Sequence, residues 1–179
     1  MSQEIAQNPI TPETCFVPQT NRGKGRRTAV APGTTAARYL HYGRITLSAG
    51  DAPEKFNSND HGLRVKNNAM RGGLLENFYF RNINVGQVAQ AVITVDFNYE
   101  EGAKGSFTPV VRNFWVDRLV SSKSKHALDV QGLAGAPIYN LNLSNCIFEN
   151  VAEPSIVKNL QNATVHNVKI NGKEITSLP

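Results

Sequence analysis

The chain has 179 residues, of which 40% are hydrophobic and 18% are charged. This composition can bury one hydrophobic core, so we expect a single folded domain. A formal net charge of +5 and a pI near 9.4 favour an anionic partner, whether nucleic acid, acidic polysaccharide or a membrane surface. The two cysteines, Cys15 and Cys146, form no C-x-x-C pair, which argues against a disulfide scaffold and a cysteine zinc site.

Residues 1–60 carry five prolines and little periodic apolar pattern, and their stretch "TNRGKGRRTAVAPGTTAAR" is rich in glycine, alanine, threonine and arginine. We predict an irregular segment here, either disordered or capping the rest of the chain. The beginning shows no basic region followed by an apolar core, so no signal peptide is visible. No apolar run approaches the roughly 18 residues that a membrane span needs. The sequence therefore predicts no membrane segment and leaves the localisation open.

One pattern recurs in residues 61–179, an apolar frame with asparagine at its third position. It appears as "LENFYFRNINV" from Leu75, "VRNFWVDRLV" from Val111, "IYNLNLSNCIF" from Ile138 and "LQNATVHNVKI" from Leu160. The four asparagines, Asn77, Asn113, Asn140 and Asn162, are separated by 36, 27 and 22 residues. This is an internal repeat. The longest interval contains "NYEEGAKGSFTP", whose glycines and proline predict an inserted loop.

Each repeat alternates apolar and polar residues with a period of two, which predicts β-strands. Further strands are predicted within residues 91–97, 126–133 and 154–159, and no intervening segment shows helical periodicity. Short strands at this spacing without helices predict an all-β, parallel β-solenoid. The candidates for its interior are Phe78, Phe80, Phe114, Val116, Leu141, Leu143, Ala163 and Val165. We expect the recurring asparagines to stack at a corner, because asparagine tolerates left-handed backbone and its amides can bond to one another.

The segment "DHGLRVKNN" places Arg64 and Lys66 two positions apart. On a strand their side chains leave the same face, and those of Leu63 and Val65 leave the other. Neighbouring cations repel each other unless an anion lies between them. The pair is therefore either part of a solvated strand face or a clamp for a carboxylate or phosphate.

Three stretches, "HGLRVKNNAMRGGLLENFYFRNINVGQV", "YEEGAKGSFTPVVRNFWVDRLVSSKSKHALDVQGL" and "APIYNLNLSNCIFENV", resemble the C-terminal coils of glycoside hydrolase family 28. This polygalacturonase-like family consists of right-handed parallel β-helix enzymes, and the resemblance covers roughly residues 61–175. It implies hydrolysis of galacturonan-type linkages in pectin by an inverting mechanism. In the family an R-[IVL]-K motif binds the carboxylate of a galacturonate unit, which implies that role for Arg64 and Lys66. Family members are often exported.

The sequence departs from the family in its acids. An inverting glycosidase needs one carboxylic acid and one carboxylate base, which the family takes from N-T-D and D-D motifs supported by the histidine of G-H-G. None of these motifs occurs here. "NSND" at 57–60 and "DHG" at 60–62 directly adjoin R-V-K and cannot lie a coil earlier. Glu100 and Glu101 belong to the inserted loop, where we expect a solvated tip, so no catalytic residue is assigned.

The length agrees with an incomplete enzyme, since family members have around ten coils and this chain has room for four to five. We expect residues 61–179 to be the C-terminal part of a parallel β-helix domain that follows an unrelated segment and is inactive alone. The open end of such a solenoid exposes unpaired strand edges. We therefore expect self-association through that end unless residues 1–60 cap it.

Two other functions stay open. The chain could be a non-catalytic module that binds acidic polysaccharide, such as galacturonan or an oligogalacturonide, through Arg64 and Lys66. It could also bind nucleic acid through the basic residues 20–38, although "GKGRRT" lacks the G-x-x-x-x-G-K-[ST] phosphate-loop pattern and the excess of basic over acidic residues in residues 1–60 is modest. The histidines, His41, His61, His126 and His166, show no metal-ligand spacing, so we predict neither metal nor cofactor.

Overall fold

The computed structural model describes residues 37–40, 45–47 and 60–179, whose regular structure is entirely β-strand. The strands are β1 (Ala37–Leu40), β2 (Ile45–Leu47), β3 (His61–Lys66), β4 (Gly73–Gln87), β5 (Ala91–Asp96), β6 (Pro109–Lys123), β7 (His126–Gln131), β8 (Ile138–Phe148), β9 (Ile156–Lys158), β10 (Leu160–Ile170) and β11 (Lys173–Ile175). The all-β prediction is confirmed. Within these ranges there is no helix that could cross a membrane.

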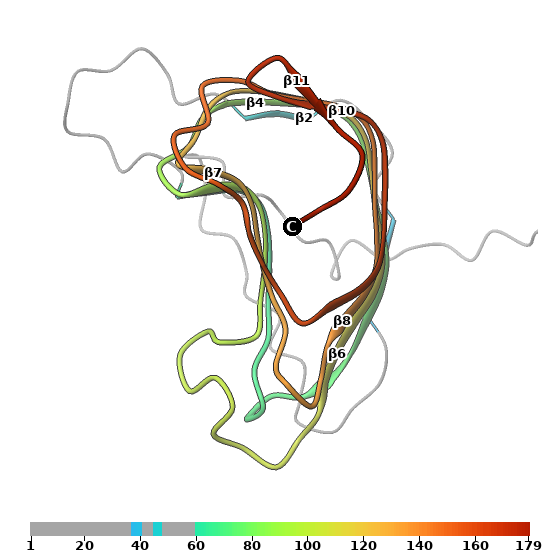
Figure 1. Ribbon diagram of the computed structural model, residues 1–179. Coiled ribbons are helices and arrows are strands. Elements are labelled where there is room, and N and C mark those ends of the chain that lie inside the picture. The colour runs from blue at the N-terminus through green and yellow to red at the C-terminus, as the bar shows by residue number, and fades with distance from the viewer. Residues whose placement is uncertain (1–36, 41–44, 48–59) are drawn as a thin grey trace, which may run out of the picture.

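The strands form two sheets. The long sheet has the order β1-β4-β6-β8-β10-β11, with β2 also paired to β4, and the short sheet has the order β3-β5-β7-β9. From β3 to β10 the chain alternates between the two sheets, and each strand pairs in parallel with its counterpart one turn later. Figure 1 looks along the resulting coil, so that successive turns lie over one another around a common interior. The predicted parallel β-helix is confirmed, and the number of coils stays a prediction.

The repeat fills the interior because equivalent apolar residues lie in register. Phe78 pairs with Phe114, and Phe114 pairs with Leu141. The Phe114 ring lies 5.2 Å from the ring centres of Phe78 and Phe80. Six of the eight predicted interior residues are buried, namely Phe78, Phe80, Phe114, Val116, Leu141 and Leu143.

The prediction fails in the last turn of the coil. Ala163 is exposed and Val165 is only half-buried. Both belong to β10, which has β8 on one side and only the three-residue β11 on the other. An interior position is buried only when a further turn covers it, and sequence alternation alone does not reveal which turn is the last.

The repeated asparagines form the predicted stack at a bend of the long strands. Asn77, Asn113, Asn140 and Asn162 have φ values of 62°, 59°, 57° and 60°. Asn113 Nδ2 donates to Asn77 Oδ1 at 2.9 Å, and Asn140 Nδ2 donates to Asn113 Oδ1 at 2.8 Å. Each amide thus connects one turn to the next while its backbone turns the corner.

A second column of left-handed residues lies five positions further along each long strand, and the sequence analysis did not find it. Its members are Asn82, Arg118, Asn145 and Asn167. Asn167 Nδ2 donates to Asn145 Oδ1 at 2.8 Å. Arg118 occupies the position that an asparagine has in the other turns, and its Nε donates to Asn82 Oδ1 at 2.6 Å. The two columns bend every long strand twice, which explains how one strand covers two sides of the coil in Figure 1.

The two ends of the coil differ. At the C-terminal end β11 runs antiparallel to β10. At the other end β1 and β2, two short strands within the segment predicted to be irregular, pair in parallel with β4. The outer edge of β3 has no strand partner among the described residues. Most of residues 1–59 lie outside the described residues, so the predicted cap and the predicted self-association through this end both stay predictions.

Candidate functional site

Arg64 and Lys66 lie on β3, which forms the edge of the short sheet. Leu63 is fully buried and Val65 is 5% exposed, while Arg64 is half-buried and Lys66 is exposed. The predicted geometry is confirmed, because the two cations share the outer face and the two apolar residues anchor the strand in the core. Their rigid strand fixes the spacing of the two charges.

A tyrosine from the inserted loop lies against this pair. Lys66 Nζ is 3.8 Å from the centre of the Tyr99 ring, and Arg64 Cζ is 5.7 Å from it. Arg71, from the loop between β3 and β4, places its Cζ 5.3 Å from the same ring centre. Three cations therefore surround one aromatic ring, whose negative face offsets part of their mutual repulsion.

Polar contacts fix the inserted loop in this position. The buried Asn68 donates to the Tyr99 carbonyl at 3.1 Å and to Glu101 Oε2 at 2.8 Å. Arg71 forms a salt bridge of 2.8 Å with Glu100. Both acids are exposed, as expected for a loop tip. They nonetheless hold Tyr99 beside the strand, a role that the sequence analysis did not assign to them.

The same two loops pack backbone against backbone. The Phe107 N–H donates to the Ala69 carbonyl at 3.0 Å. A Cβ on Gly105 would collide with the Ala69 carbonyl, so glycine is required at this close approach. The loop that carries Tyr99 is thus built into the wall of the site.

The cations of β3 differ from the arginines of β4 and β6 in their partners. Arg112 pairs with Glu76 at 2.7 Å, and Arg81 pairs with Asp117 at 3.0 Å. In the part of the chain that the structure describes, no carboxylate forms a salt bridge with Arg64 or Lys66. Arg64 Nε is buried without a hydrogen-bond acceptor among these residues. A buried donor of this kind favours an incoming anion, because an unsatisfied polar group is costly.

His61 begins β3 and shares a hydrogen bond of 2.7 Å with Thr94 Oγ1. Burial, and next the charge of Arg64, lower the pKa of His61 to about 4. The imidazole is therefore neutral at neutral pH and adds no further repulsion beside the two cations. His61 lies on the same strand as Arg64 and Lys66. The segment "DHG" therefore belongs to the same coil as R-V-K and is not a motif of an earlier coil.

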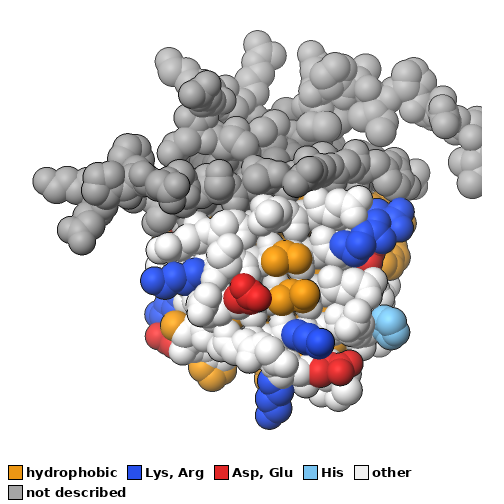
Figure 2. Space-filling view, turned by 90° about the horizontal axis from the view of Figure 1, so that it is seen from above, with side chains coloured by type: hydrophobic (Ala, Val, Ile, Leu, Met, Phe, Trp, Pro, Cys, Tyr) orange, Lys and Arg blue, Asp and Glu red, His pale blue; other side chains and the backbone are white. Residues whose placement is uncertain are grey.

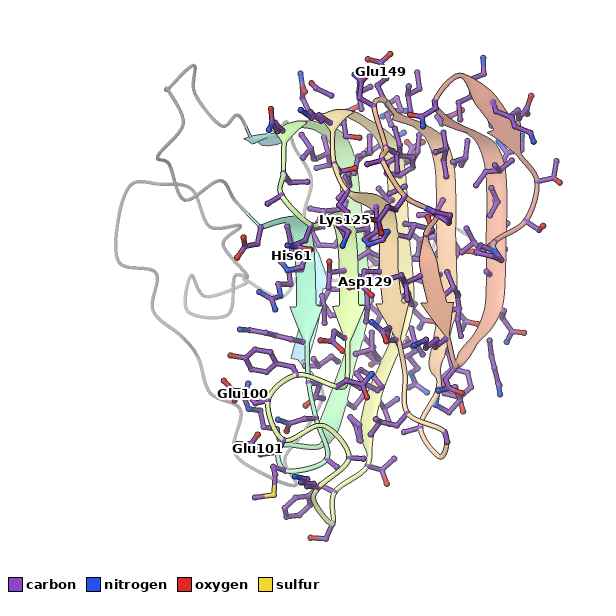
Figure 3. The ribbon with its side chains drawn as sticks, turned by 60° about the vertical axis from the view of Figure 1, so that its left-hand side comes forward. His61, Glu100, Glu101, Lys125, Asp129 and Glu149 are labelled. Carbon is purple, nitrogen blue, oxygen red and sulfur yellow. The ribbon has the colours of Figure 1, made fainter. Side chains whose placement is uncertain are left out.

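Two carboxylates on the neighbouring strands were missed by the sequence analysis. Asp96 of β5 lies opposite Lys66 in the strand register, and Asp129 of β7 lies opposite Thr94. Figure 3 looks onto the short sheet, with His61 at the start of β3 and Asp129 over β7. Burial, together with the nearby charge of Asp129, raises the pKa of Asp96. The acids are 33 residues apart in sequence, so only the register reveals that they share a face.

The structure thus brings the two predicted site residues together with Tyr99 and Arg71, which were not predicted. An aromatic residue within the glycine-rich insertion was the one available signal for Tyr99. Among the described side chains no group of three histidine, cysteine, aspartate or glutamate residues could hold a metal ion.

The chain is similar to a hyperthermoactive exopolygalacturonase from Thermotoga maritima, with 28% sequence identity and a TM-score of 0.61. The matched region covers 65% of this chain and 26% of the exopolygalacturonase, so it spans about a quarter of that enzyme. No protein-family model and no curated protein matches the chain. The fold is therefore a polygalacturonase-like parallel β-helix, defined by structural similarity rather than by a sequence family.

Proposed function

We propose that this chain binds acidic polysaccharide of the galacturonan type through Arg64 and Lys66, and that it does not hydrolyse this polymer by itself. The observation that carries the proposal is the cluster of Arg64, Lys66 and Arg71 around Tyr99, in which no described carboxylate pairs with the two strand cations. The similarity to an exopolygalacturonase supports a substrate of the pectin kind.

The chemistry of a uronate fits this cluster. A galacturonate carboxylate can accept directed hydrogen bonds from the planar guanidinium of Arg64 and an ionic contact from Lys66. The Tyr99 ring can cover an apolar face of the sugar beside them. A neutral sugar would leave both cations without an anion, which provides discrimination between the two kinds of polymer.

The absence of hydrolysis rests on the acids of this chain. The full sequence contains neither N-T-D nor adjacent aspartates nor G-H-G. Asp96 and Asp129 are the acids beside the cations, yet each already accepts a hydrogen bond, from the Asn98 N–H at 2.7 Å and from Gln131 Nε2 at 2.8 Å. We accordingly propose no catalytic role for them and keep them as the residues to test if cleavage is observed.

Nucleic-acid binding remains the weaker alternative. It depends on residues 20–38, which, apart from Ala37 and Arg38 in β1, lie outside the described residues. No contact described in the structure favours it.

The test is a titration of the full chain with polygalacturonate and with its fully methyl-esterified form, followed by an assay of reducing ends. We expect binding to the acidic polymer, at least tenfold weaker binding to the neutral ester, and no release of reducing ends, because the ester removes the charge-assisted contact. Equal affinity for both polymers would refute the proposed recognition. Turnover that is lost in Asp96→Asn would show that the chain is catalytic after all.

A further inference from the structure

The outer face of the short sheet changes its charge from one strand to the next. β3 contributes the cations Arg64 and Lys66, whereas β5 and β7 contribute the carboxylates Asp96 and Asp129. The next charge along the sheet is Lys158 at the end of β9. A band of negative charge therefore lies directly beside the cationic site.

The two carboxylates lie half-buried on the outer face of the short sheet. No lysine, arginine or histidine in the described part of the chain forms a salt bridge with Asp96 or Asp129. Lys66, the register partner of Asp96, directs its ammonium group to the Tyr99 ring instead. The distribution of charge on the long sheet is different. Figure 2 shows charges of both signs interspersed on the side over β4 and β10.

The spacing of the strands relates this pattern to a polymer. Adjacent strands lie about 4.8 Å apart, so β5 and β7 are about one and two such steps from β3. In the register Asp96 of β5 lies beside Lys66, and Asp129 of β7 lies beyond Thr94 in the row of Arg64. An oligosaccharide that starts over Arg64 and Lys66 and runs across the sheet toward the C-terminal coils therefore passes first Asp96 and then Asp129. A second uronate there would bring its carboxylate within a few ångströms of like charges, a range at which salt screens little.

We propose that Asp96 and Asp129 make this site selective for a single uronate, which is either the end of an acidic chain or is followed by a neutral sugar over β5 and β7. This inference rests on the proposed function, since it requires that Arg64 and Lys66 bind the uronate. The free oxygen of each carboxylate can accept a hydrogen bond from a sugar hydroxyl, so a neutral unit is favoured where a charged one is repelled.

The test compares affinities for galacturonate and for its dimer, using the ratio of the two association constants as the readout. We expect a ratio near one for the natural chain and a ratio about fivefold higher for the double variant Asp96→Asn/Asp129→Asn, because two like charges about 4 Å apart in water repel by about that factor. The matched control Glu149→Gln/Glu174→Gln changes the net charge equally at exposed positions away from the short sheet, and its ratio should stay near one.

A second comparison needs no variant. The natural chain should bind a disaccharide of galacturonate and rhamnose more tightly than digalacturonate. An unchanged ratio in the double variant, or tighter binding of digalacturonate by the natural chain, would overturn this inference and leave the proposed function intact. If the natural chain binds no galacturonate of any length, the proposed function is wrong and this inference falls with it.

Discussion

Replacing Arg64 with alanine is expected to weaken the binding of galacturonate oligomers by about 10- to 150-fold, which corresponds to the roughly 1.5–3 kcal/mol of a hydrogen bond to a charged group. The Nε of Arg64 is buried and has no hydrogen-bond acceptor among the described residues. No carboxylate among these residues forms a salt bridge with its guanidinium. Lys66→Ala should have a smaller effect of the same sign, because an exposed and strongly hydrated ammonium gains less from contact with an anion than a half-buried guanidinium does. Calorimetric titration at fixed ionic strength would measure both.

Two further variants separate the geometry of Arg64 from its charge. Arg64→Lys keeps the charge and removes the planar fork, so it should recover only part of the lost affinity. Lys169→Ala removes one exposed cation from β10 in the long sheet and should leave the affinity nearly unchanged. Equal losses in Arg64→Ala and Lys169→Ala would mean that net charge, rather than a site on β3, attracts the polymer.

Replacing Phe114 with alanine is expected to lower the free energy of unfolding by about 3–5 kcal/mol, the usual effect of removing a buried aromatic ring. Phe114 is fully buried between the turns that carry Phe78 and Leu141. Its ring contacts two further phenylalanine rings at 5.2 Å, so the variant leaves a cavity at the centre of the repeat. Denaturant unfolding followed by circular dichroism would measure the loss.

The matched control lies on the same strand. Val120 of β6 is 43% exposed, so Val120→Ala should change the free energy of unfolding by no more than about 0.5 kcal/mol. If Phe114→Ala does not fold, Phe114→Leu should show a smaller loss of the same sign. A loss below about 1 kcal/mol in Phe114→Ala would contradict the packing of the repeat.

The fold was predictable because its determinants are periodic in the sequence. Alternation fixes which side of a strand faces inward, and the asparagine of each repeat marks the bend where Asn77, Asn113 and Asn140 adopt left-handed backbone. The second column was harder to see, because Arg118 interrupts its asparagines. Ala163 was assigned to the interior wrongly, because burial depends on a covering turn and not on alternation alone.

The site was predictable only in part, for a different physical reason. Arg64 and Lys66 are neighbours along one strand, so their common face follows from local geometry. Tyr99 reaches them through a loop held by contacts with Asn68 and Arg71, and such contacts leave no periodic trace. Asp96 and Asp129 adjoin the pair through register alone, which a single sequence does not specify.

The most direct test of uronate binding is an NMR titration that observes the side-chain Nε–Hε resonances of the arginines. We expect the Arg64 resonance to shift as galacturonate is added and to stay in place when galactose is added. Arg112 and Arg118 serve as internal controls, because they are paired with Glu76 and Asp117 and should not respond. An Arg64 resonance that is unchanged at saturating galacturonate would contradict the assignment of β3 as the binding site.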